Sequence, residues 1–432
     1  VGSRGLGDVY KRQDIKTADN NGYAYRAGDV VAEFTTGADG SSVIDNLPLG
    51  SYVLTETKAP AGFVIDTDPV DVTFTYAGQT VDIVKDSKTV EDERQKIAVD
   101  ANKTDAATMN PLLNTVFALY ADEDIVNHDG TVIIKKGAMI ERQTTNALGK
   151  AVFVSDLPLG HYIVKEIDSP TGYGNRFESK TIDAAYKSQT TKVQTFSYFF
   201  EDDHTEIVRT QATDTATGTH QGALSADNKY VVYDHVECDN LFPGKTYTLK
   251  GALTDKDTGK TLKDINGNDV TDSVTFKATG VKQTVTVTFS FEAELAGKTL
   301  VAYENMFQDG KMIYTHADID DTEQTVYYPE IHTTATDKAS QTHTGTVDEQ
   351  TTVIDKVDYK NLIPGSTYEV SGVLMNQETG AALLDKDGKE ITAKTTFKAE
   401  KASGSVELAF TFDSTLLIGK SVVAFEELYN EN

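Results

Sequence analysis

A stretch that occurs twice in the chain ends in a glutamate that is expected on the same strand face as an aromatic residue. The first copy reads LPLGSYVLTE and ends at Glu56, and the second reads LPLGHYIVKE and ends at Glu166. Side chains alternate across a strand, so Glu56 is expected on the face of Tyr52 and Glu166 on the face of Tyr162. A carboxylate that faces a core is costly unless it is protonated or paired. Both glutamates are therefore candidate functional residues.

The same alternation predicts two more inward polar side chains near Glu166. Lys103 shares its expected strand face with Val99, and Asp202 shares its face with Phe200. One hypothesis is structural: the groups form a buried ion pair or reach the rim of the core. The other is covalent, because in an apolar site a lysine loses its proton more easily and a carboxylic acid keeps its own. Lys103 would then be the nucleophile, Asp202 the electrophile and Glu166 the proton relay of an amide-forming reaction.

A second constellation combines a hydroxyl, an amide, two acids and an imidazole. Strand alternation predicts that Thr210 and Gln324 point inwards, where a simple hydrogen-bonded pair is the ordinary interpretation. Asp234 and Glu304 are also expected to point inwards, with His316 nearby. A histidine that takes the threonine proton activates a poor nucleophile, and two protonated acids polarise the glutamine carbonyl. This hypothesis predicts an ester between threonine and glutamine, formed with loss of ammonia.

A metal site is the alternative interpretation of the acidic run after the histidine, which contains His316, Asp318, Asp320 and Asp321. The acidic turns at 255–257 and 264–269 also look superficially like calcium loops. They lack the full ligand series and its terminal glutamate, so hairpin turns are favoured. We expect no metal and no cofactor.

Composition excludes several classes of partner. The 432 residues include 40 Lys and Arg against 67 Asp and Glu, a net charge of −27, which argues against nucleic acid and anionic membranes. Solubility is the ordinary interpretation of this acidity. The single cysteine, Cys238, rules out an intrachain disulfide. No run of 18 apolar residues is present, so no membrane span is expected.

Short alternating runs between Asp, Gly, Asn and Pro turns predict an all-β chain of several domains. Two kinds of module are each written twice. Residues 14–96 and 97–206 share the LPLG stretch, and residues 207–329 and 330–432 share a Thr-x-Ala-Thr-Asp start. The candidate side chains therefore lie on strands of β-sandwich modules.

The first and last modules lack part of the pattern. Residues 1–13 fit no repeat and resemble adapter-derived peptides, so we expect a non-native leader and leave it out of the fold. The first module then has no counterpart of the Lys103 strand and is expected to be truncated at its N-terminus. The last module is expected to be truncated before the strand with histidine and glutamine. The residues left without partners are Glu56, Asp92, Thr333, Asp355 and Glu426.

The frame from Lys103 through the repeated stretch to the last strand resembles the Cna-B/SpaA-type prealbumin-like domains of Gram-positive surface proteins and pilins. The resemblance covers residues 14–206. It implies a self-made isopeptide bond between Lys103 and Asp202, with Glu166 as the catalytic glutamate.

The later modules resemble VaFE-repeat, or T-Q ester-bond, domains. The motif reads VAYE at 301–304 and VAFE at 423–426, and the resemblance covers residues 207–432. It implies a bond between Thr210 and Gln324. The assisting residues that it implies are Asp234, Glu304 and His316.

Together the resemblances imply tandem Ig-like or prealbumin-like β-sandwich modules in a linear stalk, part of an adhesin on the cell wall of a Gram-positive bacterium. A covalent tie between strands would resist unzipping as a disulfide does, without being reducible. We expect one self-modifying event for each bond and not an enzyme. The implied partners are peptidoglycan, through sortase in the full-length protein, and host surface ligands, through an N-terminal domain that is missing here.

Two alternatives stay open. In the first alternative, one module is itself an adhesin that recognises a host matrix protein or glycan. An exposed apolar or aromatic patch would distinguish this alternative, and the sequence does not show one. The other alternative is a true enzyme, but no separate nucleophile–base pair, metal signature or phosphate loop supports it.

Overall fold

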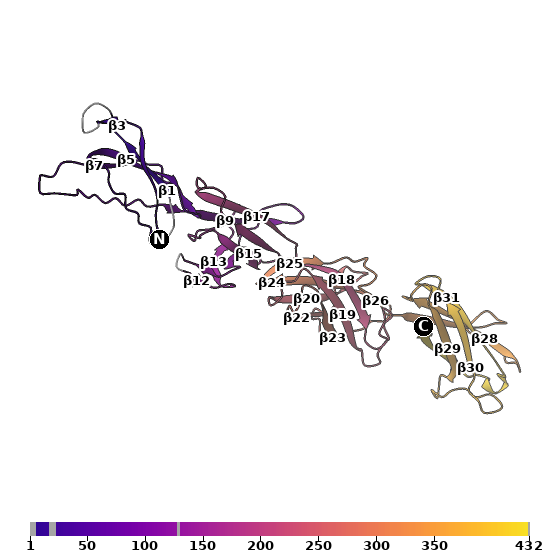
Figure 1. Cartoon of the computed structure of the whole chain (residues 1–432). Coiled ribbons are helices and arrows are strands. Elements are labelled where there is room, and N and C mark those ends of the chain that lie inside the picture. Colours follow the sequence, from indigo (N-terminus) through magenta and orange to yellow (C-terminus); the bar gives the residue numbers. More distant parts are fainter. Residues whose placement is uncertain (1–5, 17–22, 128–129, 431–432) are drawn as a thin grey trace. The chain divides into compact units, whose positions relative to one another are not determined.

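Strands joined by tight turns build the computed structural model (Figure 1). The structure describes residues 6–16, 23–127 and 130–430. Those ranges hold one short 3-10 turn, η1 (Thr415–Leu417), and no α-helix, so the all-β prediction is confirmed. The chain divides into two units, Val1–His204 and Thr205–Asn432. Each unit contains two of the repeated modules.

The first module is built on one sheet, in the order β4-β1-β5-β7, with two small pairs, β2-β3 and β6-β8. Its strands are β1 (Leu6–Lys11), β2 (Ile15–Lys16), β3 (Tyr23–Tyr25), β4 (Val30–Thr35), β5 (Gly50–Lys58), β6 (Phe63–Val64), β7 (Val70–Phe74) and β8 (Glu93–Arg94).

The sequence-based treatment of residues 1–13 is wrong for Leu6–Lys11, which form β1 inside this sheet. Val9 pairs with Leu54 of β5 and is buried, with 4% of its surface exposed. The physical reason is that β5 must satisfy its backbone groups, and an extended segment of almost any sequence can do this. The non-native origin of the leader stays a prediction.

The second module has two facing sheets, β13-β10-β15-β16 and β14-β9-β17, and a small pair, β11-β12. Aromatic and aliphatic side chains from both sheets form its core. The strands are β9 (Lys96–Asp105), β10 (Val116–Ala121), β11 (Ile125–Val126), β12 (Val132–Ile134), β13 (Met139–Thr144), β14 (Lys150–Phe153), β15 (Gly160–Asp168), β16 (Ser179–Ala184) and β17 (Val193–Asp202).

The first and last strands of the second module pair in parallel. Lys103 of β9 lies opposite Phe200 of β17, and Asp105 lies opposite Asp202. A parallel pair brings the C-terminal ends of both strands to the same edge. The pairing therefore places an early lysine beside a late aspartate although almost the whole module separates them in sequence.

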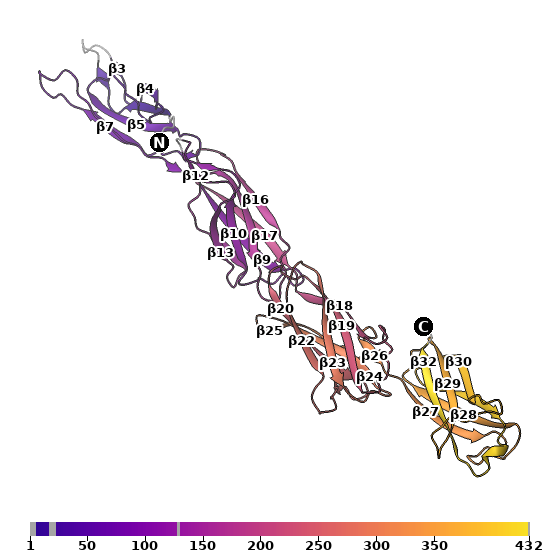
Figure 2. The same ribbon diagram turned by 90° about the horizontal axis from the view of Figure 1, so that it is seen from below.

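The third module also has two facing sheets. One has the order β18-β19-β23, and the other has the order β21-β20-β24-β25, with β22 on β20 and β26 on β24 (Figure 2). The strands are β18 (Glu206–Asp214), β19 (Lys229–Asp239), β20 (Thr246–Asp255), β21 (Lys260–Thr261), β22 (Thr271–Lys277), β23 (Gln283–Glu292), β24 (Thr299–Gln308), β25 (Lys311–His316) and β26 (Thr325–Tyr327).

The fourth module repeats the central strands of the third in the orders β27-β28-β31 and β30-β29-β32. Within the described part of the chain, β32 pairs with β29, whereas its counterpart β24 also pairs with β25 and β26. The strands are β27 (Glu330–Asp337), β28 (Thr351–Lys360), β29 (Thr367–Asn376), β30 (Thr392–Lys398), β31 (Gly404–Phe412) and β32 (Val422–Asn430).

A glycine in β20 allows an aromatic ring to cover Glu304. Gly251 pairs with Glu304 in the sheet, and a Cβ at Gly251 would lie 2.6 Å from Cζ of Phe289. The fourth module repeats the contact, because a Cβ at Gly372 would lie 2.8 Å from Cζ of Phe410. In both modules the missing side chain lets the ring pack against the backbone beside the paired glutamate, Glu304 or Glu426.

We predict that Gly251→Ala destabilises the third module by about 1–3 kcal/mol, because the added methyl group overlaps the Phe289 ring. Urea unfolding of the full chain, monitored by hydrogen exchange of the β20 backbone amides, measures the loss of stability. Gly280→Ala is the matched control, since the nearest atom to its added Cβ is 3.5 Å away. Equal stability of the two variants would contradict the packing argument.

Candidate functional site

Three strands of the second module bring the predicted lysine and its two acids together. Lys103 comes from β9, Glu166 from β15 and Asp202 from β17. Lys103 Nζ lies 2.6 Å from Glu166 Oε2 and 2.6 Å from Asp202 Oδ1. The exposed fractions of these side chains are 1%, 2% and 0% respectively. The inward orientation expected from strand alternation is therefore what the structure has.

Lys103 makes two short contacts with buried acids. Its Nζ donates a hydrogen bond to Glu166 Oε2. The contact of Nζ with Asp202 Oδ1 is an equally short ion pair. The amine therefore lies directly against the aspartate carboxyl group, with the glutamate on its other side.

Burial controls the protonation of the two acids. It raises the pKa of Glu166 to about 8, helped by the negative charge of Asp202 and opposed by Lys103. Burial also raises the pKa of Asp202, again opposed by Lys103. Phe117 and Phe200, with ring centroids 4.8 Å apart, line the core beside these groups. An acid in this site is therefore held closer to its neutral form than the same acid in water.

Sequence reasoning missed one buried hydroxyl at this site. Ser169 donates a hydrogen bond to Glu166 Oε1 at 2.6 Å, and its side chain is buried. It follows β15 in a turn, where the two-residue alternation of strands no longer predicts direction. The repeat itself held a signal, because the first module has Ala59 at this position.

In the first module the corresponding acids contact each other. Burial raises the pKa of Glu56 to about 7, with the backbone of Asp66 acting against it and Asp92 adding to it. Burial likewise raises the pKa of Asp92. Among the described residues, neither acid forms an ion pair with a lysine. Lys11 is buried, but its Nζ lies over the ring of Tyr52, 3.6 Å from the centroid.

The third module gathers its candidate groups in the core between the two sheets. Thr210, Asp234, Glu304 and Gln324 are all buried. Gln324 Nε2 donates to Asp234 Oδ1 at 3.0 Å. Among the described residues, the hydroxyl of Thr210 and the carbonyl oxygen of Gln324 have no hydrogen-bond partner, whereas Glu304 lies against Asp234. Burial raises the pKa of Glu304 well above its usual value, and Asp234 adds to this effect.

His316 lies beside this cluster rather than on the threonine. It pairs with Glu304 across β24 and β25, and its Nε2 lies 2.9 Å from Asp321 Oδ2. No hydrogen bond joins it to Thr210, whose Oγ1 is unpartnered. Asp321 also accepts a hydrogen bond from the backbone N–H of Glu323 at 2.9 Å. Sequence reasoning assigned Asp321 no role in the ester site, and the structure pairs it with the histidine.

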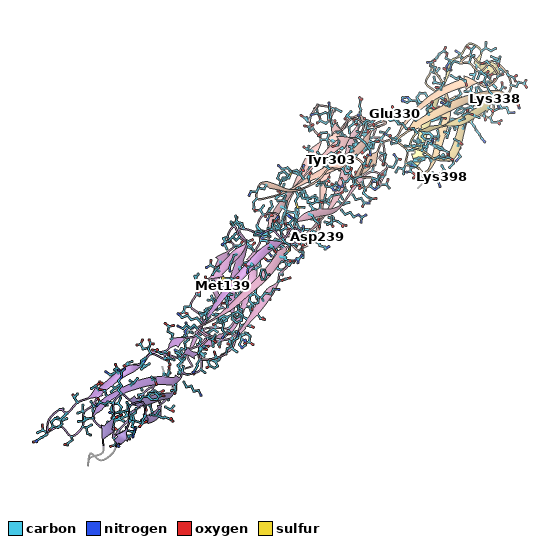
Figure 3. The ribbon with its side chains drawn as sticks, turned by 90° about the horizontal axis from the view of Figure 1, so that it is seen from above. Met139, Asp239, Tyr303, Glu330, Lys338 and Lys398 are labelled. Carbon is cyan, nitrogen blue, oxygen red and sulfur yellow. The ribbon has the colours of Figure 1, made fainter. Side chains whose placement is uncertain are left out.

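Tyr303, which Figure 3 labels, lies on the face of the sheet that is turned away from this cluster. It precedes Glu304 in β24, and successive side chains of a strand point to opposite faces. Within the described ranges, no group of three or more His, Cys, Asp and Glu side chains is arranged to hold a metal ion. The arrangement offers a hydroxyl, an amide carbonyl and acids in one dry site.

The fourth module retains the acids. Asp355 is fully buried and lies against Glu426. Burial raises the pKa of Glu426 to about 8, and Asp355 adds to this shift. Thr333 is exposed here, whereas Thr210 is buried in the third module. The counterpart site is therefore more open than the site of the third module.

Large apolar side chains on the surface are spread over the modules. Phe199, Leu416 and Ile418 are exposed by 71%, 92% and 73%, and the first of these lies in a different module from the other two. In the part of the chain that the structure describes, we find no helix with the length and apolar character needed to cross a membrane.

Two family models match the chain. The model of the T-Q ester bond containing domain matches residues 206–328 and 329–432, more than half of the chain. The model of the SpaA prealbumin-like fold domain matches residues 10–89 and 98–198. A search of curated proteins finds no match.

Solved structures of bacterial surface proteins are similar to this chain. The Bacillus anthracis TIE protein is 18% identical with a TM-score of 0.34, and the match covers 70% of this chain and 42% of that one. The full-length major pilin SpaD from Corynebacterium diphtheriae is 14% identical with a TM-score of 0.26, covering 80% of this chain and 88% of the pilin. An adhesin from Mobiluncus mulieris that contains disulfide, isopeptide and ester cross-links is 13% identical with a TM-score of 0.25, covering 47% and 76%.

The acid pair of the first module predicts a loss of stability with rising pH. The pKa of Glu56 is raised from 4.5 to about 7 in the fold, so its contribution is complete below 4.5 and is lost as pH rises through about 7. We expect hydrogen-exchange protection of β5 in the full chain to fall over this interval, after correction for the intrinsic exchange rate.

Glu56→Gln should flatten this dependence, because an amide does not titrate. Glu33→Gln, at an exposed position on β4, is the matched control and should behave like the wild type. Protection that stays constant from pH 4.5 to above 7 in the wild type would contradict the assignment.

Proposed function

This chain belongs to the family of proteins that carry T-Q ester bond containing domains, and from that premise we propose that it is a structural region of a bacterial surface adhesin or pilin, stabilised by two self-formed covalent bonds. One bond joins Lys103 to Asp202 and the other joins Thr210 to Gln324. The observation that carries the proposal is the buried contact of 2.6 Å between Lys103 Nζ and the Asp202 carboxyl group.

The isopeptide bond forms by condensation of the buried amine with the buried acid. The Lys103 ammonium group gives a proton to Glu166 Oε2, 2.6 Å away, and the free amine attacks Cγ of protonated Asp202. Glu166 takes a second proton from the new C–N centre as it returns the first to the departing hydroxyl. The C–O bond breaks, water leaves, and a neutral amide replaces an amine and an acid.

The ester bond forms by attack of the Thr210 hydroxyl on Cδ of Gln324. Asp234 holds the amide group through its hydrogen bond from Gln324 Nε2, and Glu304, when protonated, donates to the carbonyl oxygen and stabilises the negative charge that develops on it. His316 accepts the threonine proton and passes it to the leaving nitrogen, so the C–N bond breaks and ammonia departs. Because His316 is bonded to Asp321 and not to Thr210, this step needs a local movement of the loop after β25.

The mechanical consequence follows from which strands are joined. A bond from β9 to β17, or from β18 to the segment before β26, closes nearly a whole module into one covalent loop. A pulling force would pass through the bond, and the strands between its ends would be shielded. Each bond forms once, so the chain is not a turnover enzyme in this proposal.

The proposal places the protein outside the cell, on the wall of a Gram-positive bacterium. Peptidoglycan, reached through sortase in the full-length protein, and host surface ligands are the proposed partners. The family matches support the surface-protein class, and the two partners rest on the resemblance described above.

Intact mass spectrometry of the denatured chain tests both bonds at once. We expect a deficit of about 18 Da from one water and about 17 Da from one ammonia, about 35 Da together. Glu166→Ala should restore only the water, whereas Thr210→Ala or His316→Ala should restore only the ammonia.

Matched controls are available for these variants. Glu201→Ala on β17 changes a half-buried glutamate that pairs with Arg176, and His332→Ala on β27 changes an exposed histidine; both lie outside the two sites and should keep the full deficit. A folded wild-type chain of unmodified mass would refute both bonds. A wild-type chain that has lost only the mass of water, or only that of ammonia, would show which bond fails to form.

A further inference from the structure

The turn after β15 places a hydroxyl against the proposed proton relay. Ser169 Oγ donates to Glu166 Oε1 at 2.6 Å, while Lys103 donates to the other oxygen, Oε2, at 2.6 Å. Each oxygen of this carboxyl group therefore has its own donor, one on β9 and one in the turn. Ser169 is buried, so water does not compete for this bond.

The repeat supplies an internal comparison. The turn reads Ser169-Pro-Thr-Gly in the second module and Ala59-Pro-Ala-Gly in the first. The hydroxyl is thus present in the module where Glu166 faces a lysine. It is absent in the module where Glu56 lies beside Asp92 and accepts a hydrogen bond from the backbone N–H of Asp66. The rest of the turn is closely similar, so the difference is not explained by the needs of the turn itself.

A fixed carboxyl orientation matters for the proposed reaction. Glu166 must accept a proton at Oε2 while Lys103 Nζ stays within 2.6 Å of Asp202. A free carboxyl group can rotate about its last bond and turn Oε2 away from the amine. The bond from Ser169 removes this freedom, and pre-organisation of this kind contributes directly to rate.

The Ser169 hydroxyl also affects the protonation of the two acids. Burial raises the pKa of both Glu166 and Asp202, and the Ser169 hydroxyl opposes this rise in both. Lys103 is the other group that faces the two acids, with Tyr173 close enough to feel the charge of Asp202. Removing the hydroxyl leaves the two acids with a stronger hold on their protons.

We propose that Ser169 is a positioning residue for the isopeptide reaction, which fixes the Glu166 carboxyl group so that Oε2 faces Lys103 Nζ. This inference rests on the proposed Lys103–Asp202 bond. It assigns to the turn a role that the bond-forming residues do not by themselves require. The two modules also differ at this position, which is not among the residues proposed to form the bond.

The test measures the rate of water loss in the newly made full chain. The chain is synthesised in a cell-free system at several pH values, quenched in denaturant at intervals and weighed by intact mass spectrometry. The loss of ammonia from the third module in the same spectra serves as an internal measure of folding. Ser169→Ala should slow water loss by about ten-fold or more and leave the loss of ammonia unchanged.

The pH profile distinguishes positioning from packing. With the hydroxyl removed, the alkaline limb of the water-loss rate should move to higher pH, because Glu166 and Asp202 keep their protons longer. Ser169→Thr retains a hydroxyl and should restore most of the rate. Ser197→Ala is the matched control, since Ser197 of β17 donates its hydroxyl to Asp100 of β9 and not to a residue of the site.

Each outcome decides the question. A Ser169→Ala chain with wild-type rate and pH profile overturns the positioning role, and so does a Ser197→Ala chain that slows equally. Failure of Ser169→Thr to recover any rate would mean that shape and not the hydroxyl matters, which also overturns it. A wild-type chain that never loses water refutes the proposed bond itself, which is a different failure.

Discussion

Removal of ionisable groups from water is the constraint on which the candidate sites depend. Lys103, Glu166 and Asp202 are almost fully buried beside two aromatic rings. An isolated charge in such a place costs several kcal/mol, so the fold must pair these groups, neutralise them or convert them. Condensation of amine and acid to an amide removes two of the ionisable groups permanently. The same logic covers Glu304, whose pKa is raised by burial and by the neighbouring Asp234.

The four modules show how the same constraint is met with different partners. In the first and fourth modules the acids have each other, and the pKa of Glu56 and of Glu426 is raised to about 7 and about 8. Both of these glutamates are more exposed than their counterparts Glu166 and Glu304. In the second module Lys103 lies beside the acids, in the third module Thr210 and Gln324 are buried with them, and burial is nearly complete. The acids are therefore most deeply buried in the modules where Lys103, or Thr210 and Gln324, lie with them. The strands that carry these side chains also cover the acids.

Strand alternation was enough to predict which side chains point inwards, since Lys103, Glu166 and Asp202 obey the two-residue period. It did not predict the parallel pairing of β9 with β17, because that contact depends on the whole module. The treatment of Leu6–Lys11 was wrong because backbone pairing tolerates almost any sequence. Ser169 and the Asp321 partner of His316 were missed because turn residues follow no period. Module boundaries and bond formation stay predictions.

The central claim is that the amine of Lys103 is part of an amide, and nuclear magnetic resonance can observe that nitrogen directly. The full chain is labelled with nitrogen-15 at lysine side chains and with carbon-13 at aspartate. The account predicts one lysine nitrogen with an amide signal, coupled to the side-chain carbonyl carbon of an aspartate, and the loss of this signal in Lys103→Arg. A spectrum in which every lysine nitrogen of the folded chain is an ordinary amine would contradict the account.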